Sequence, residues 1–185
     1  MAKWKNKWNL GVQLLINCIM AVFPFHLNLP KTDIFIETGT GLGSTAKLAY
    51  EHYKKVYTMD LFTGINVNNF DSQRLVFFQE SSLTILPKIL KNINERCTFW
   101  LDAHPNNNDV NTWPLLDELR LIYEHPIKNH NIVIDDTDTI MNNGKMNYII
   151  NGLCKNNPDY KFNMTIISQI RSLDTFIATT EKITV

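Results

Sequence analysis

The fold of this chain is decided by the stretch Ile34-Phe35-Ile36-Glu37-Thr38-Gly39-Thr40-Gly41-Leu42-Gly43. Its apolar start predicts a buried strand that ends near Glu37. The alternating glycines let the backbone approach a ligand closely, and the helix expected next exposes N–H donors at its N-terminus. Ser44 and Thr45 are the expected N-caps of that helix. The stretch therefore predicts a strand, a ligand-binding loop and a helix in succession.

Outward from this loop, short apolar runs alternate with helical patterns, which is typical of a parallel α/β sheet. The expected strands are Ile34–Glu37, Lys55–Met59, Leu75–Gln79, Thr98–Leu101 and Asn131–Ile134, and the expected helices are Ser44–His52, Leu83–Lys91, Leu115–Tyr123 and Lys145–Lys155. Two alternating β runs, Tyr160–Ile167 and Thr175–Thr180, close the pattern as a hairpin. The sequence predicts a mostly parallel sheet with an antiparallel C-terminal strand.

Composition indicates a single globular domain and argues against a dedicated nucleic-acid-binding protein. The chain has 185 residues, of which 44% are hydrophobic and 19% charged, as in ordinary globular domains. Eighteen basic residues balance eighteen acidic ones, so bulk charge attracts neither nucleic acid nor acidic lipid. The three cysteines form no CxxC pair. This pattern predicts reduced thiols in a cytoplasmic protein, without a disulfide framework or a zinc site.

The N-terminal segment differs from the rest of the chain in its sequence pattern. We expect residues 1–30 to be a helical extension and residues 31–185 to be the ligand-binding domain. Three lysines precede the apolar run Leu10–Phe23, which superficially resembles a secretory signal. Polar residues interrupt this run, and it is short for a bilayer span. We expect a helix that stays in the mature protein outside the membrane; a signal, an anchor or a partner-binding lid helix are the alternatives.

The glycine spacing excludes the usual dinucleotide motif. In G-x-G-x-x-G the third glycine would fall at Ser44 or at Ala46, depending on the starting glycine. The loop instead fits E-x-G-x-G-x-G, and the carboxylate of Glu37 suits a cationic, amino-acid-bearing cofactor better than a pyrophosphate. Asp60 ends the second expected strand, where an acid can accept hydrogen bonds from both ribose hydroxyls.

These residues resemble the class I S-adenosylmethionine-dependent methyltransferases, over roughly residues 30 to 185. The resemblance implies a Rossmann-like fold with a seven-stranded sheet and S-adenosylmethionine as cofactor. It implies that the loop wraps the methionyl part of the cofactor, that Asp60 holds the ribose and that Glu80 and Ser81 contact the adenine. The implied cofactor-binding residues are Glu37, Gly39, Thr40, Gly41, Gly43, Ser44, Asp60, Glu80, Ser81 and Asp102.

A second constellation follows the fourth and fifth expected strands. Asp102 and His104 follow one, and Asp135 and Asp136 follow the other. Carboxyl ends of parallel strands open onto one crevice, and acids gathered there need a hydrogen bond, a charge partner or a metal. Three carboxylates suit a hard divalent cation, Mg²⁺ by preference. Alternatively, Asp102 lines the cofactor pocket and the other two acids hold loops.

Asp102, Asp135 and Asp136 also match the metal positions of the catechol-type O-methyltransferases, which this arrangement is similar to. Asp136 departs from that pattern because the family has an amide there, and an expected lysine is absent. The wider pattern looks more like small methyltransferase-like proteins linked to sugar or natural-product tailoring. The resemblance implies Asp102, Asp135 and Asp136 as metal ligands. His104 is the expected general base, with Asp102 as a second catalytic residue.

The sequence thus predicts methyl transfer to a hydroxyl of a small molecule or sugar, with a divalent metal as a further option. A non-catalytic cofactor- or partner-binding module and a nucleotide-dependent Rossmann-like enzyme remain alternatives. No nucleic-acid partner is expected, because the Asn/Asp-Pro-Pro-aromatic motif of amino-methylating DNA enzymes is absent. A homo-oligomer is left open. His52, His125 and His130 are expected at the surface or at helix ends.

Overall fold

The computed structural model describes residues 29–62, 64–105, 110–166 and 174–181. Its elements alternate between strand and helix as predicted. In chain order they are β1 Ile34–Thr38, α2 Ser44–His52, β2 Lys55–Asp60, β3 Leu75–Gln79, α3 Ser82–Leu90, β4 Cys97–Leu101, the 3-10 helix η1 Val110–Thr112, α4 Leu115–Glu124, β5 Asn131–Ile134, α5 Thr137–Asn142, α6 Met146–Asn156, β6 Lys161–Ile166 and β7 Asp174–Thr179.

The strands form one seven-stranded sheet in the order β3-β2-β1-β4-β5-β7-β6. Strands β1 to β5 pair in parallel, and β7 pairs antiparallel with both β5 and β6. This confirms the predicted α/β, Rossmann-like architecture with its antiparallel C-terminal hairpin. Strand order reverses beside β1, whose last residue Thr38 pairs with Met59 and with Leu101. Ligands of open α/β sheets bind at such a switch point, outside the carboxyl ends of the strands.

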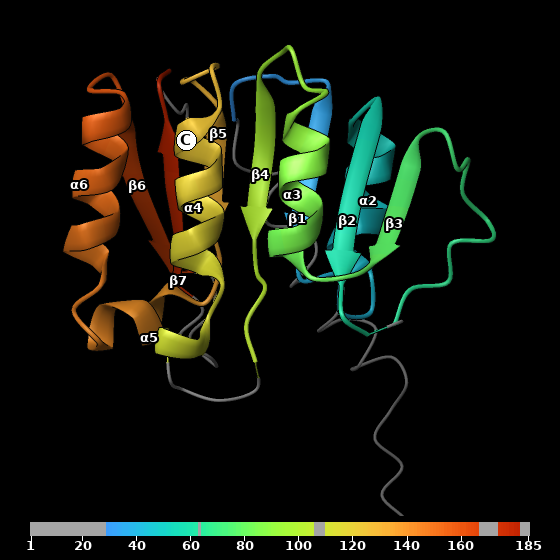
Figure 1. The fold of residues 1–185 in the computed structure, drawn as a ribbon, viewed down its shortest axis with the longest axis horizontal. Coiled ribbons are helices and arrows are strands. Elements are labelled where there is room, and N and C mark those ends of the chain that lie inside the picture. The colour runs from blue at the N-terminus through green and yellow to red at the C-terminus, as the bar shows by residue number, and fades with distance from the viewer. Residues whose placement is uncertain (1–28, 63, 106–109, 167–173, 182–185) are drawn as a thin grey trace, which may run out of the picture.

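Helices cover both faces of the sheet (Figure 1). Helices α3, α4 and α6 lie over one face, and α2 lies over the other beside β2. Because successive side chains of a strand point to opposite faces, Ile36 and Phe99 pack under the first layer while Phe35 and Val56 pack near α2. All four side chains are fully buried, and each contributes about 1.5–3 kcal/mol by leaving water.

Several local expectations need correction. The N-cap of α2 is Gly43 in the left-handed region, with φ 77°, and neither Ser44 nor Thr45 caps the helix. The short helices α5 and η1 were not predicted, because they are too brief to show a helical period. His125 ends α4 as its C-cap, in agreement with the expected helix-end position, whereas His130 lies neither at the surface nor at a helix end. Both are buried, with 4% and 1% exposure, because their rings hydrogen-bond to each other and to backbone near the starts of β4 and β5.

The predicted N-terminal helical extension lies almost entirely outside the described residues, so its helix and its retention stay predictions. Among the helices that the structure describes, none combines the length and apolar character needed to cross a membrane.

Candidate functional site

The glycine loop leaves β1 with a backbone that side chains disfavour. Gly39 and Gly41 have φ values of 84° and 51°, in the left-handed region that costs other L-residues about 1–2 kcal/mol. An added Cβ at Gly39 would lie 2.3 Å from the carbonyl oxygen of Asp102. An added Cβ at Gly41 would meet nothing within 4 Å. The first glycine therefore packs the loop against β4, and the second leaves open space beside the backbone.

Asp60, at the end of β2, holds this loop in place. Its Oδ2 accepts a hydrogen bond from the Gly41 N–H at 2.8 Å, and its Oδ1 accepts one from the Phe62 N–H at 3.0 Å. Each carboxylate oxygen keeps a second lone pair. The structure thus brings together Asp60 and the glycine loop, which the sequence assigned to one cofactor. The Asp60 carboxylate can still accept hydrogen bonds from hydroxyl groups.

Glu37 lies beneath the loop and is 1% exposed. Its Oε2 accepts a 2.5 Å hydrogen bond from the Thr58 hydroxyl, which is also 2.6 Å from the Thr40 hydroxyl. Burial raises the pKa of Glu37 to about 8, the Thr58 bond lowers it and the charge of Asp60 raises it. Glu37 and Thr40 therefore support the loop from below through a buried hydrogen-bond chain.

The remaining predicted cofactor residues flank the same edge. Ser44 is the first residue of α2. Glu80 is exposed, and its Oε1 accepts a hydrogen bond from the Ser81 N–H at 3.2 Å. The preceding residue of β3 pairs with Asp60, so Glu80 and Ser81 lie directly beyond the ribose-binding candidate. Their contact with an adenine stays a prediction.

Beyond β4, an imidazole bridges two carboxylates. His104 Nε2 lies 2.8 Å from Asp136 Oδ2 and 3.6 Å from Asp102 Oδ1. One ligand atom from each of these three residues can be chosen so that all lie within 4.8 Å of one another. Their side chains are 25–29% exposed, so the cluster is open to solvent yet partly desolvated. The group that converges is thus Asp102, His104 and Asp136.

Asp135 takes a different position from the other acids. Its Oδ1 accepts a hydrogen bond from the Thr175 hydroxyl of β7 at 3.2 Å, and its N–H donates to Leu101 O at 3.1 Å. Its role as a metal ligand therefore stays a prediction. Asp136, the N-cap of α5, has a φ of 50° and makes no side-chain cap hydrogen bond. Strained backbone of this kind clusters at functional sites, and here it directs Asp136 toward His104.

The charges of this cluster shift the pKa values of its members. Burial raises the pKa of Asp102 well above its usual range, and the neighbouring Asp135 and Asp136 raise it further. Burial raises the pKa of Asp135 to about 6, helped by Asp136. The hydrogen bond to Asp136 raises the pKa of His104 against the opposing effect of burial. The mutual repulsion of the three carboxylates is therefore relieved by protonation of a carboxyl group, by a protonated His104 or by a bound cation.

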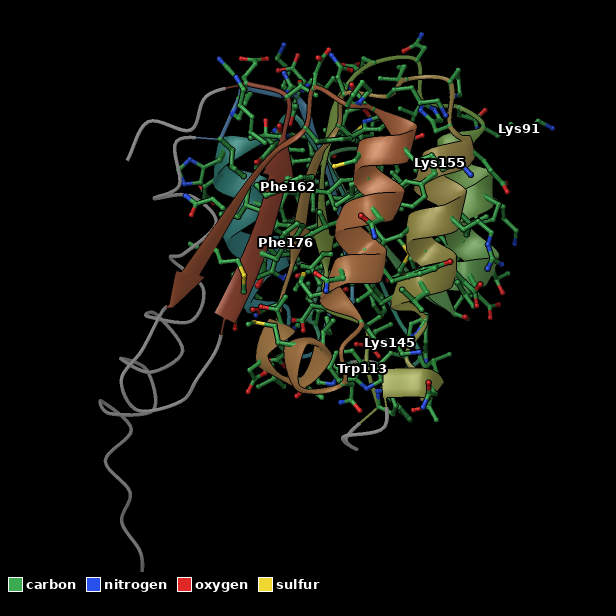
Figure 2. All side chains as sticks on the ribbon, turned by 90° about the vertical axis from the view of Figure 1, so that its left-hand side faces the viewer. Lys91, Trp113, Lys145, Lys155, Phe162 and Phe176 are labelled. Carbon is green, nitrogen blue, oxygen red and sulfur yellow. The ribbon has the colours of Figure 1, made fainter. Side chains whose placement is uncertain are left out.

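Two residues outside the predicted site residues also border this cluster: Trp113, which the sequence places beside a candidate substrate rim at residues 105–112, and Glu118. Trp113 stacks on the His104 ring at a centroid distance of 4.7 Å, at the end of the molecule where α5 lies (Figure 2). Glu118 of α4 is fully buried, and burial raises its pKa to about 7. In the sequence, Glu118 is recognisable only as an acid in the middle of an amphipathic helix, and such an acid usually lies on the solvent-exposed face.

Comparisons with known proteins agree with this architecture. The sequence matches no family model and no curated protein. Among solved structures, it is similar to a candidate methyltransferase from Streptococcus mutans in complex with SAH, with 16% identity and a TM-score of 0.51 over 90% of this chain and 97% of that one. An rRNA methylase from Streptococcus thermophilus shows 12% identity and a TM-score of 0.55 over 96% and 98%.

Spermidine synthase from Thermotoga maritima shows 14% identity and a TM-score of 0.59. That match covers 91% of this chain but 60% of the synthase. At these identities the likeness concerns the fold. Together with the strand order, it gives the chain the Rossmann-like fold of class I methyltransferases.

Proposed function

We propose that this protein is an S-adenosylmethionine-dependent methyltransferase that acts on a hydroxyl group of a small molecule or sugar. The observation that carries the proposal is the glycine loop clamped to Asp60, at the switch point of the sheet and beside the cluster of Asp102, His104 and Asp136. The equal numbers of acidic and basic residues favour a small acceptor over a nucleic acid.

The residues of the loop fit the cofactor. A Cβ at Gly41 would meet nothing within 4 Å, so the loop backbone is open to a ligand there, and Asp60 has lone pairs left for the ribose hydroxyls. S-adenosylmethionine, when bound, supplies an electrophilic methyl group on a sulfonium sulfur. The protein's main contribution is to hold the acceptor oxygen in line with that methyl group. Asp102 and His104 are the proposed proton acceptors, because their raised pKa values make them stronger bases than the free side chains.

The donor set also fits a divalent cation, in the arrangement of Asp102, His104 and Asp136. An imidazole among two carboxylates favours Mn²⁺, Fe²⁺ or Zn²⁺ over Mg²⁺. Such a cation, when bound, lowers the pKa of a coordinated hydroxyl. It competes with the proton that the Asp136 hydrogen bond retains on His104. We therefore propose that, where a metal is bound, it is a transition-metal ion in place of the Mg²⁺ that the sequence pattern alone favoured. Asp102 and His104 then act as ligands, and they act as proton acceptors in the metal-free alternative.

Calorimetry with S-adenosylhomocysteine tests the cofactor assignment. We expect wild type to bind it and Asp60→Ala to bind at least tenfold more weakly, because the ribose hydroxyls lose a charged acceptor. Asp117→Ala, an exposed acid of α4, is the matched control and should bind like wild type. Equal affinity of all three proteins would refute the assignment, and binding without turnover on any hydroxylated acceptor would favour the non-catalytic module.

Titration with MnCl₂ tests the metal site separately. We expect binding to tighten as the pH rises, with proton release, because the ion displaces the His104 proton. His104→Ala should weaken Mn²⁺ binding at least tenfold, whereas the Asp117→Ala control should not change it. Equal Mn²⁺ binding by the His104 variant and wild type would show that the ion is held elsewhere.

A further inference from the structure

The core-facing side of α4 carries an acid. Leu115, Leu119 and Ile122 are buried on this side, and Glu118 lies between them with no exposed surface. A carboxylate is rarely buried unless other groups pair with it, because removing its charge from water is costly. A carboxyl at this position is therefore expected to make contacts that an apolar side chain cannot.

The carboxyl of Glu118 has two hydroxyl partners. Its Oε2 accepts a hydrogen bond from the Thr38 hydroxyl at 3.3 Å, and the Ser82 hydroxyl also hydrogen-bonds to the carboxyl. Both hydrogen bonds favour the ionised form and oppose the rise of the pKa to about 7 that burial causes. Thr38 and Ser82 are themselves buried, so both bonds lie in a low-dielectric interior, where they are stronger than in water.

The two partners stand where two elements of the proposed cofactor site begin. Thr38 is the last residue of β1 and directly precedes Gly39, the first glycine of the loop. Ser82 is the first residue of α3 and directly follows Ser81, a predicted adenine contact. Helices α3 and α4 lie side by side over the same face of the sheet (Figure 1). The Glu118 carboxyl thus bridges the start of the glycine loop and the start of α3.

Strand pairing connects these two starting points only indirectly. In the sheet, β2 separates β3, which leads into α3, from β1, which leads into the glycine loop. Helix α4 follows β4, on the other side of β1. Glu118 reaches from α4 to both elements, so one side chain links two parts of the site that are not neighbours in the sheet.

We propose that Glu118 is a positioning residue for the cofactor. Its carboxyl fixes the spacing between the glycine loop, assigned to the methionyl end, and the start of α3, assigned to the adenine end. The inference rests on the proposed methyltransferase function and adds to it a residue that does not touch the cofactor. A ligand that spans both ends depends on this spacing, because binding groups must be held within about 0.5 Å of their productive geometry. A ligand confined to the adenosine end does not.

The test uses calorimetry with two ligands: S-adenosylhomocysteine, which spans both ends, and methylthioadenosine, which lacks the amino-acid chain. In Glu118→Leu we expect S-adenosylhomocysteine to bind at least about tenfold more weakly, and methylthioadenosine to bind within about twofold of wild type. Glu118→Gln should keep the affinity for S-adenosylhomocysteine within about threefold, because its amide still accepts from Thr38 and can donate to Ser82. Glu124→Leu, exposed on the same helix, is the control and should bind both ligands like wild type.

Thermal unfolding separates positioning from a purely structural role. Glu118→Leu removes the desolvation cost of a buried carboxyl but leaves two hydroxyls without their acceptor, so the unfolding midpoint should change little while the affinity for S-adenosylhomocysteine falls. Thr38→Val removes the donor hydroxyl on the loop side of the bridge. It tests the same link by an independent route and should show the same selective loss of affinity.

The outcomes distinguish this inference from the proposed function. A loss of affinity confined to S-adenosylhomocysteine, in Glu118→Leu and in Thr38→Val, supports the positioning role. Equal losses for both ligands, or no loss for either, overturn it and leave the proposed function standing. Wild type that binds neither ligand overturns the proposed function and the positioning role together.

Discussion

His125 and His130 form a buried pair at the end of the sheet opposite the candidate site, and this pair makes the stability of the protein depend on pH. His130 Nδ1 accepts a hydrogen bond from the Cys97 N–H at 3.0 Å, so this nitrogen carries no proton. Its Nε2 must then donate to His125 Nδ1, 3.0 Å away, while His125 Nε2 donates to Ile93 O at 3.2 Å. The chain of bonds therefore requires neutral rings with the proton on Nε2.

Acid destabilises this arrangement by an amount that follows from the pKa shift. Burial, the neighbouring His125 and the positive charges of Arg96 and Lys128 together lower the pKa of His130 from 6.5 to about 3, with burial the largest cause. The unfolded chain takes up this proton as the pH falls through 6.5, whereas the folded chain resists until about pH 3. Stability from His130 is thus fully present above pH 6.5 and is lost below it. At 1.36 kcal/mol per pKa unit, the loss at pH 5 relative to pH 8 is about 2 kcal/mol.

Urea unfolding at pH 8, 7, 6 and 5, compared between wild type and His130→Asn, isolates this effect from other titrating groups. Asparagine can still accept from the Cys97 N–H but does not titrate, so we expect the stability advantage of wild type to shrink by about 2 kcal/mol from pH 8 to pH 5. His52→Asn replaces an exposed histidine and serves as the control. A wild-type advantage over His130→Asn that stays constant with pH would refute the neutral buried pair.

Four further substitutions test the construction of the site and of the sheet edge. Gly39→Ala should destabilise the fold by about 2–4 kcal/mol, because the strain of a positive φ adds to an overlap with the backbone of Asp102, whereas Gly41→Ala should cost only the φ strain of about 1–2 kcal/mol. Thermal unfolding measures both losses of stability, and equal losses would contradict the close packing at Gly39. Glu37→Gln should gain about 2–3 kcal/mol relative to wild type between pH 6 and pH 9, because a carboxyl with a pKa of about 8 resists the ionisation that the unfolded chain undergoes freely; urea unfolding at both pH values measures it, and a flat difference would disprove the shift. Arg74→Lys should cost about 1–2 kcal/mol, since the guanidinium both donates to the Tyr50 carbonyl and lies 4.1 Å above the Tyr50 ring; denaturant unfolding checks this, and an unchanged midpoint would show that neither contact stabilises.

The local sequence pattern was sufficient to predict the strands, most of the helices and the glycine loop. The apolar runs of the central strands β1, β4 and β5 are buried on both faces, so they remain visible in the sequence without any knowledge of their neighbours. The alternating glycines likewise predicted a ligand-binding loop from local pattern, and in the structure all three have positive φ, which glycine adopts without strain. Asp60 was predictable because the end of the second strand has a fixed place beside the first βα loop in this architecture.

The tertiary structure alone decided how the acids after β4 and β5 divide their roles. Asp135 and Asp136 are adjacent in sequence and chemically identical, yet the left-handed backbone at Asp136 turns one toward His104 while β7 brings Thr175 to the other. Neither the backbone angle nor the register of a strand forty residues away is encoded in a local pattern.

The same holds for the residues that sequence reasoning missed or misplaced. Glu118 resembles any surface acid of an amphipathic helix until the packing of α4 on the sheet places it against Thr38. His125 and His130 resemble surface or helix-end residues in the sequence, but in the fold their rings are buried and hydrogen-bond to each other. The sequence by itself determined which segments are buried and where a ligand loop lies. Only the folded chain determined which polar side chains meet in the interior, because such contacts join residues far apart in sequence and leave no periodic signal.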